Sequence, residues 1–83
     1  MSGATIELLY FARVAEMLGK RGERLPLPEP ADTVQLLADL AARYPQLDAA
    51  GRLKIAVNQT HVKGRAPLAA GDEVAVFEPV TGG

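Results

Sequence analysis

The chain has 83 residues, of which 48% are hydrophobic and 23% charged, and its formal net charge is −1. A chain of this length buries only about 60% of the surface that its unfolded form exposes, so it accommodates one domain with one core. Acidic residues are interleaved with the basic ones along the sequence. This disfavours nucleic-acid binding, because no basic stripe forms.

The sequence indicates neither a membrane segment nor a secretion signal. No apolar run approaches the roughly 20 residues that a bilayer span requires. Residues 1–4 lack a basic segment followed by an apolar stretch. We therefore expect a cytoplasmic protein that does not enter a membrane.

Cysteine is absent, and His61 is the only histidine. The lack of cysteine excludes disulfides, thiolate nucleophiles, iron–sulfur clusters and thiolate zinc sites. A transition-metal site would need carboxylates clustered by the fold, and no close-spaced ligand pattern indicates one. We expect no stably bound metal or cofactor. A free-standing enzyme is disfavoured, because the sequence offers no set of nucleophile, base and orienting group.

Residues 5–11 are rich in branched and aromatic side chains, which predicts a strand. Side chains alternate between the two faces of a strand, so the segment divides into two sets. The set assigned to the core is Ile6, Leu8 and Tyr10. The set assigned to the opposite face is Glu7, Leu9 and Phe11.

A short helix and an edge strand are expected next. Residues 12–18 are good helix formers and end at Gly19, a favourable C-terminal stop. Residues 23–28 alternate polar and apolar side chains and contain Pro26 and Pro28. Proline donates no ladder hydrogen bond, so this segment is predicted to be an edge strand that returns along the first one. The charged residues around it, Lys20, Arg21, Glu23 and Arg24, are interpreted as a solvated turn.

The main helix is predicted to begin at residues 32–35, which match a capping box. In that motif Asp32 accepts from the third helical amide, and Gln35 reaches back to the amide of the cap. The side chains predicted to face the core are Val34, Leu37, Leu40, Ala41 and Tyr44. Those predicted to face away are Gln35, Asp39 and Arg43. Pro45 disfavours helical geometry at the preceding residue and ends the helix.

Three further strands are predicted in the second half. Residues 54–58 and 60–63 alternate around a turn at Asn58-Gln59. A turn at residues 69–72 leads into a last strand at residues 73–77. The side chains expected to point inward are Ile55, Val57, Val74 and Val76. Phe77 is expected to point outward.

This order predicts an α+β fold of the β-grasp type, a mixed sheet with one main helix across one face. Its first and last strands would be parallel neighbours joined through the helix, and the end of the chain would lie at the sheet edge. The domain would span residues 1–77, followed by a flexible tail at residues 78–83. A ferredoxin-like sandwich, the alternative, requires a second full-length helix, and none is indicated after residue 45.

The tail reads Glu78-Pro79-Val80-Thr81-Gly82-Gly83. Its two glycines have no side chain, so they can thread a narrow channel and let a partner approach the terminal carboxylate closely. Pro79 stiffens the exit from the domain. The alternative is that the Gly-Gly pair has no function, as terminal residues often do not. A pair that directly follows the last strand of a β-grasp pattern favours a tail that is presented to a partner.

Over nearly its whole length the sequence resembles the small subunit of molybdopterin synthase, within the ubiquitin-like sulfur carriers. The resemblance rests on the motifs Leu9-Tyr10-Phe11-Ala12, Ala56-Val57-Asn58-Gln59, Pro67-Leu68, Gly71-Asp72-Glu73-Val74 and Phe77-Glu78-Pro79-Val80-Thr81-Gly82-Gly83. One position departs from the family, which often has a second proline where Glu78 stands here. We expect this change to adjust partner affinity without changing function.

The resemblance implies that an activating enzyme uses ATP and Mg²⁺ to adenylate the carboxylate of Gly83, which a sulfur donor then converts to a thiocarboxylate. The sulfur would pass to precursor Z, forming the dithiolene of molybdopterin in molybdenum cofactor biosynthesis. The partner would be the large subunit, in a heterotetramer of two small and two large subunits. Catalytic side chains would belong to the large subunit, and this chain would be its non-catalytic sulfur donor. The lack of cysteine agrees with sulfur held on a terminal carbonyl carbon.

The resemblance also implies the residues that carry function. The reacting group would be Gly83, preceded by Gly82. Partner binding would use Phe11, His61, Phe77, Pro79, Val80 and Thr81, because exposed apolar groups that cluster often mark an interface. Phe11 and Phe77 could instead complete the core, and His61 could be structural. Two other functions stay open: a sulfur carrier for thiamine or tRNA thiolation, and a non-covalent interaction module with a silent tail.

Overall fold

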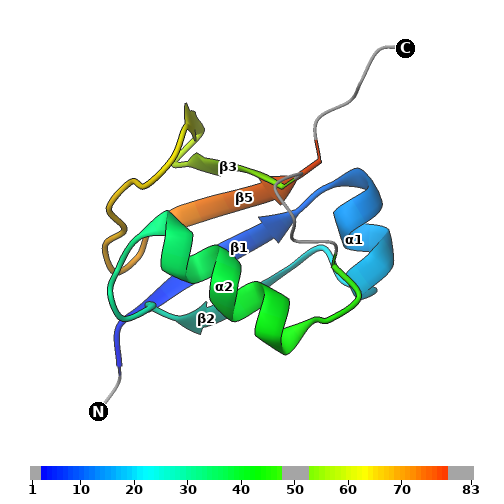
Figure 1. The fold of residues 1–83 in the computed structure, drawn as a ribbon, viewed down its shortest axis with the longest axis horizontal. Coiled ribbons are helices and arrows are strands. Elements are labelled where there is room, and N and C mark those ends of the chain that lie inside the picture. The colour runs from blue at the N-terminus through cyan, green and yellow to red at the C-terminus, as the bar shows by residue number, and fades with distance from the viewer. Residues whose placement is uncertain (1–2, 48–52, 79–83) are drawn as a thin grey trace.

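The computed structural model describes residues 3–47 and 53–78. Along these stretches the elements are β1 (Thr5–Tyr10), α1 (Ala12–Leu18), β2 (Gly22–Pro26), α2 (Thr33–Arg43), β3 (Lys54–Val57), β4 (Thr60–Val62) and β5 (Glu73–Phe77). The strands form one mixed sheet, and Figure 1 shows α2 crossing one face of it. The α+β, β-grasp prediction is confirmed. In the described stretches no helix follows α2, which argues against the ferredoxin-like alternative.

The sheet has the strand order β2-β1-β5-β3-β4, with the parallel pair β1 and β5 at its centre. β2 pairs antiparallel with β1, and β3 pairs antiparallel with the other side of β5. The predicted parallel pairing is therefore confirmed. The end of the chain, which the sequence placed at the sheet edge, lies outside the described residues, and the strand before it, β5, lies inside the sheet. β5 is central because β3 and β4 extend the sheet beyond it. The edge position predicted for the proline-containing strand is confirmed, because β2 has a partner on one side only.

Local backbone geometry explains where two elements end. Gly19 has φ 71°, and its amide donates to the carbonyl of Ala15 at 2.9 Å, which closes α1 where the sequence predicted. Asn58 and Gln59 also have positive φ angles, 50° and 71°. A two-residue loop with both φ angles positive matches the twist of an antiparallel hairpin, here β3–β4.

The start of α2 contains half of the predicted capping box. Asp32 Oδ1 accepts from the amide of Gln35 at 2.7 Å, as expected for the cap. The prediction that the Gln35 side chain reaches back to the amide of Asp32 is wrong. The amide of Asp32 instead donates to the carbonyl of Pro30 at 3.0 Å, and Gln35 Nε2 donates to Asp39 Oδ1 at 2.8 Å. Because the loop before the helix already satisfies the cap amide, the Gln35 side chain is left to pair along the exposed helix surface.

The core-facing side of α2 is rotated from the predicted one. Thr33, Leu36 and Leu40 are 2%, 1% and 0% exposed, whereas Val34 is 45% exposed. The prediction of Val34 as a core residue is wrong, and Leu36 was missed. Thr33 can occupy a buried position because its hydroxyl donates to the carbonyl of Gly64 at 2.9 Å. Hydrophobicity alone could not identify a buried threonine.

The core lies between α2 and the sheet face that α2 covers. The central strands contribute their inward sets, as predicted, and these side chains are almost fully buried: Ile6, Leu8, Tyr10, Val74 and Val76. α1 adds Val14, and the hairpin adds Ile55. The alternating residues of the same strands point to the other face, which α2 leaves open. The two faces of the sheet therefore serve different purposes.

We predict that Leu36→Ala and Val34→Ala, two substitutions on the same helix, differ sharply in their effect on stability. Leu36→Ala should lower the free energy of unfolding by about 2–5 kcal/mol, because it leaves a cavity in the core. Val34→Ala should change it by about 0.5 kcal/mol or less, because the side chain is exposed. Urea unfolding of the two variants measures both values, and equal losses would contradict the orientation of α2.

Candidate functional site

The sheet face opposite α2 carries a row of small and apolar side chains. The β1–β5 register aligns Leu9 with Ala75. The registers of β3 align Ala75 with Ala56, and Ala56 with His61. Together with the two phenylalanines at the strand ends, this row makes up the outer face: Leu9, Phe11, Ala56, His61, Ala75 and Phe77. The two alanines were not predicted as site residues, although the strand alternation already placed them on this face.

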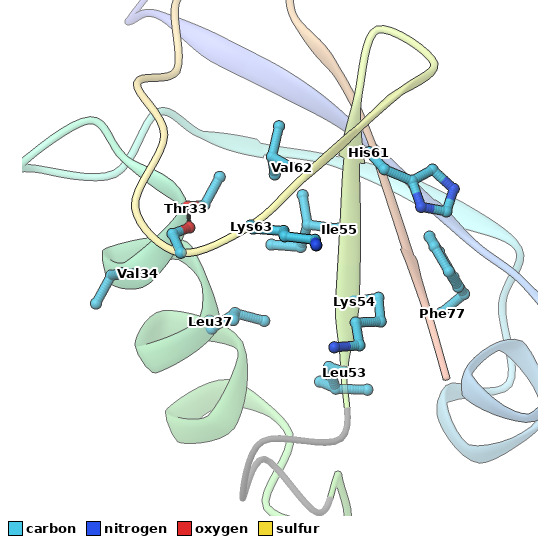
Figure 2. Close-up of a pocket in the computed structure, with 11 residues that line it drawn as sticks. Thr33, Val34, Leu37, Leu53, Lys54, Ile55, His61, Val62, Lys63 and Phe77 are labelled. Atoms are coloured by element: carbon cyan, nitrogen blue, oxygen red, sulfur yellow. Dashed lines mark hydrogen bonds between the residues drawn. The ribbon is translucent and has the colours of Figure 1, made fainter. Parts of the chain in front are cut away.

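His61 and Phe77 lie against each other on the outer face. Their ring centroids are 5.3 Å apart with an angle of 55° between the ring planes, and Figure 2 shows both rings on the same side of β3. His61 is exposed, and Phe77 is partly exposed. The pair joins the edge strand β4 to the central strand β5 across β3. A tilted aromatic pair of this kind offers a mixed apolar and polar surface to a partner.

Phe11 lies at the same end of the sheet as Phe77. Its amide donates to the carbonyl of Val76 at 3.3 Å, and the parallel register pairs Tyr10 with Val76. Phe11 and Phe77 are therefore the next residues along two neighbouring strands. Phe11 is 49% exposed, which contradicts the alternative that it completes the core. The structure thus brings all three predicted body residues of the site to one face.

The predicted tail begins where the outer face ends. Glu78 follows β5, and its Oε1 lies 3.9 Å from Arg13 Nε at the start of α1. The Arg13 side chain is 72% exposed, so the ion pair contributes little to stability. The remaining predicted tail residues lie outside the described residues: Pro79, Val80, Thr81, Gly82 and Gly83.

Away from the outer face, a cluster of polar side chains joins β1, β2 and the end of α2. The hydroxyls of Tyr10 and Tyr44 both donate to Glu23 Oε2 at 2.6 Å, and Lys20 Nζ donates to Glu23 Oε1 at 3.1 Å. Lys20 Nζ also lies 3.0 Å from the Tyr44 hydroxyl. The interpretation of Lys20 and Glu23 as a solvated turn is therefore wrong. No local pattern could have predicted this network, because it joins residues that are distant in the sequence.

The network shifts the protonation of its members. Burial alone raises the pKa of the Glu23 carboxyl, but the hydrogen bonds from Tyr10, Tyr44 and Lys20 outweigh it and hold the pKa below its usual value. Burial and the hydrogen bond to Glu23 raise the pKa of the Tyr10 hydroxyl far above its usual value. Both oxygens of the carboxylate are engaged, so Glu23 is not a free base. The cluster is structural, and it fixes the end of α2 to the sheet.

Residues 3–47 and 53–78 contain neither a metal-binding cluster nor a membrane-spanning helix. There, no group of three or more histidine, cysteine or acidic side chains is placed to hold a metal ion. The helices α1 and α2 are also too short and too polar to cross a membrane. The outer face is thus the main candidate for function in the part of the chain that the structure describes.

The central parallel pair, the crossing helix and the five-stranded order define a protein of the ubiquitin-like β-grasp class. The chain belongs to the ThiS family, whose model matches residues 8–83. This match includes the tail residues that the structure does not describe.

Named relatives agree with this assignment. The chain is 43% identical to the Escherichia coli molybdopterin synthase sulfur carrier subunit, over 94% of this chain and 99% of the relative. It is 37% identical to the human protein of the same name, over 94% and 93% of the two chains. These matches span almost the full length of both relatives, and they confirm the resemblance that the motifs indicated.

Solved structures give the same fold. A Pyrococcus furiosus protein assigned as molybdopterin converting factor subunit 1 has a TM-score of 0.79 and 30% identity, and the match covers 94% of this chain and all of that one. A Helicobacter pylori chain, described in a complex of subunits 1 and 2 of molybdopterin-converting factor, has a TM-score of 0.68. At 22% identity, over 95% of this chain and 99% of that one, the second likeness supports the fold alone.

We predict that the Glu23 network makes stability depend on pH at both extremes. Because the folded pKa of Glu23 is lowered, its contribution is present above the unfolded value of about 4.3 and is lost as pH falls through the folded pKa. Because the folded pKa of Tyr10 is raised, its contribution is present below about 10 and is lost as pH rises further. Urea unfolding between about pH 3 and 11 measures both losses.

Glu23→Gln should remove much of the acid-side loss and lower the free energy of unfolding at neutral pH by about 1–3 kcal/mol. Glu16→Gln, at an exposed carboxyl on α1, is the matched control and should leave both quantities nearly unchanged. If Glu23→Gln were as stable as the wild type at neutral pH, the structural role of the network would be refuted.

Proposed function

We propose that this protein is the sulfur carrier subunit of a molybdopterin synthase and that the carboxyl group of Gly83 carries the sulfur. The single observation that carries this proposal is the family match, which runs through residue 83 and so includes the Gly-Gly pair. The names of the relatives, at 43% and 37% identity over nearly their full lengths, support the same conclusion.

The proposed chemistry begins with activation of the Gly83 carboxylate. A carboxylate is a poor electrophile, so a separate activating enzyme would use ATP and Mg²⁺ to form an acyl-adenylate and release pyrophosphate. A sulfur donor would then displace AMP, leaving a thiocarboxylate whose sulfur is a polarisable nucleophile. No cysteine in this chain can hold sulfur, which leaves the terminal carbonyl carbon as its carrier. The chain itself would bind no cofactor.

In this proposal the body of the protein positions the tail. The outer face would dock on the large subunit, and residues 79–83 would enter the active site of that subunit. Glycine at positions 82 and 83 suits passage through a narrow channel, because neither residue has a side chain. The large subunit would supply the catalytic side chains that convert precursor Z. A heterotetramer of two small and two large subunits is part of the same proposal.

Two alternatives share part of this proposal. A carrier for thiamine or tRNA thiolation would use the same tail chemistry, and the names of the relatives favour molybdopterin over it. Co-purification with a pterin-binding large subunit would support the molybdopterin assignment. An interaction module with a silent tail would use the outer face alone, and changes at Gly83 separate it from both carriers.

We predict that deleting Gly83, or adding one residue after it, abolishes sulfur transfer. Either change moves the reacting carboxyl group relative to the outer face, while the folded body stays intact. Intact mass spectrometry after incubation with the activating enzyme, ATP and a sulfur source should show a gain of about 16 Da in the wild type, since sulfur replaces oxygen. Sulfur transfer that survived both changes would refute the carrier function.

We also predict that Phe77→Ala weakens binding to the large subunit at least tenfold, which is about 1.4 kcal/mol or more. The substitution removes one ring of the pair with His61 but no residue of the core cluster. Asp39→Ala, at an exposed position of α2 on the other side of the sheet, is the control and should leave the affinity unchanged. Isothermal titration calorimetry measures both. A large loss of stability in Phe77→Ala with unchanged affinity for the large subunit would contradict the docking role.

A further inference from the structure

An open pocket of about 570 Å³ lies between the first turns of α2 and the β3–β4 hairpin. Its apolar walls come from Val34 and Leu37 on α2 and from Leu53, Ile55 and Val62 on the hairpin side. Figure 2 shows the α2 side chains on one side of β3 and the His61–Phe77 pair on the other. The name α2–β3 pocket refers to this hollow and its lining.

Hydrogen bonds between the start of α2 and the loop after β4 shape the α2–β3 pocket. The amide of Thr33 donates to the carbonyl of Ala66 at 2.9 Å, and the amide of Ala66 donates to Thr33 Oγ1 at 3.0 Å. Thr33 Oγ1 in turn donates to the carbonyl of Gly64 at 2.9 Å. These bonds hold the loop after β4 against the start of α2. A preformed pocket of this kind loses little conformational freedom when an occupant binds.

The apolar part of the pocket includes a side chain that the fold itself does not need. Val34 is 45% exposed, and with Phe11 it forms the pair of large hydrophobic residues that are exposed in the described part of the chain. Leu53 and Ile55, at 8% and 4% exposure, belong to the core and form the floor. An exposed aliphatic side chain above a preformed apolar floor is typical of a docking surface.

The rim of the pocket is basic. Lys54, His61 and Lys63 all line it and are exposed, and among the described residues no acidic side chain is part of the lining. The ion pairs found among the described residues use four basic side chains elsewhere, Arg13, Lys20, Arg24 and Arg65. Lys54 and Lys63 thus have no described acidic partner. Two unpaired ammonium groups beside an apolar hollow attract an occupant that carries both carboxylates and aliphatic groups.

We propose that the α2–β3 pocket binds an extended acidic segment of the large subunit, with an aliphatic side chain against Val34 and carboxylates at Lys54 and Lys63. This proposal rests on the proposed function for the identity of the partner. The surface is continuous, because His61 and Phe77 belong both to the outer face and to the lining of the pocket. A partner chain on the outer face therefore reaches the pocket by passing round the β3–β4 edge.

The charge-reversal variant Lys54→Glu/Lys63→Glu tests the electrostatic half of the proposal. We expect it to weaken binding of the full-length large subunit at least tenfold and to flatten the dependence of affinity on salt between about 50 and 300 mM. Arg21→Glu/Arg43→Glu is the matched control, since it changes the net charge equally at two exposed positions that do not belong to the outer face. We expect less than a threefold effect for this control.

The variant Val34→Asp tests the apolar half. Its side chain is exposed, so the variant should keep the unfolding midpoint of the wild type while binding the large subunit at least tenfold more weakly. As a direct measure of occupancy, methyl NMR of the labelled small subunit should show large shifts at Val34, Leu37 and Val62 when the unlabelled partner is added. Unchanged methyl signals in the complex would overturn the proposal.

The outcomes separate this inference from the proposed function. If Phe77→Ala weakens binding while Lys54→Glu/Lys63→Glu and Val34→Asp do not, the pocket is not a docking site but the outer face is. If none of the three weakens binding, docking through the outer face is itself refuted. If inorganic pyrophosphate at or below 1 mM shifts the amides of Lys54 and Lys63 saturably in the free protein, the occupant is a small anion and the peptide assignment is overturned.

Discussion

The parallel pairing of β1 with β5 is the constraint on which the rest of the structure depends. These two strands come from opposite ends of the domain, and their register joins Glu7 with Glu73 through to Tyr10 with Val76. Parallel neighbours require a crossover, and α2 covers the buried face of the pair on the way. The same pairing brings Phe11, Phe77 and the start of the tail to one end of the sheet. The geometry of the fold thus decides where the chain leaves the sheet after Phe77.

The two faces of the sheet differ in composition and in burial: the inner face forms the core, and the outer face does not. The inner face is filled by branched residues such as Ile6 and Val76, both fully buried. Polar groups near this core are satisfied by long-range hydrogen bonds, as at Thr33 and Glu23. The described chain leaves no buried side-chain donor or acceptor unpaired. The residues of the outer face do not belong to the core cluster, so this face is available for a partner.

The proposed division of labour between body and tail follows from chemistry that the chain lacks. The chain has no cysteine, and its one histidine lies on the outer face, so sulfur would have to be held elsewhere than on a thiol. Specificity for a partner would then depend on surfaces, and the shared residues His61 and Phe77 connect two of them. A carrier that binds an activating enzyme and a synthase in turn needs specificity for each of them. A surface that combines charge with apolar contact can provide this specificity.

The sequence by itself determined the features that depend on short-range sterics and alternation. These are the inward set of β1, the helix stop at Gly19 and the hairpin turn at Asn58. The motifs also indicated the family, because each of them is a short run of neighbouring residues. Only the tertiary structure decided the buried side of α2, the central place of β5 and the Glu23 network. The physical reason is that each of these depends on which distant segments pack together, and that contact has no local signature.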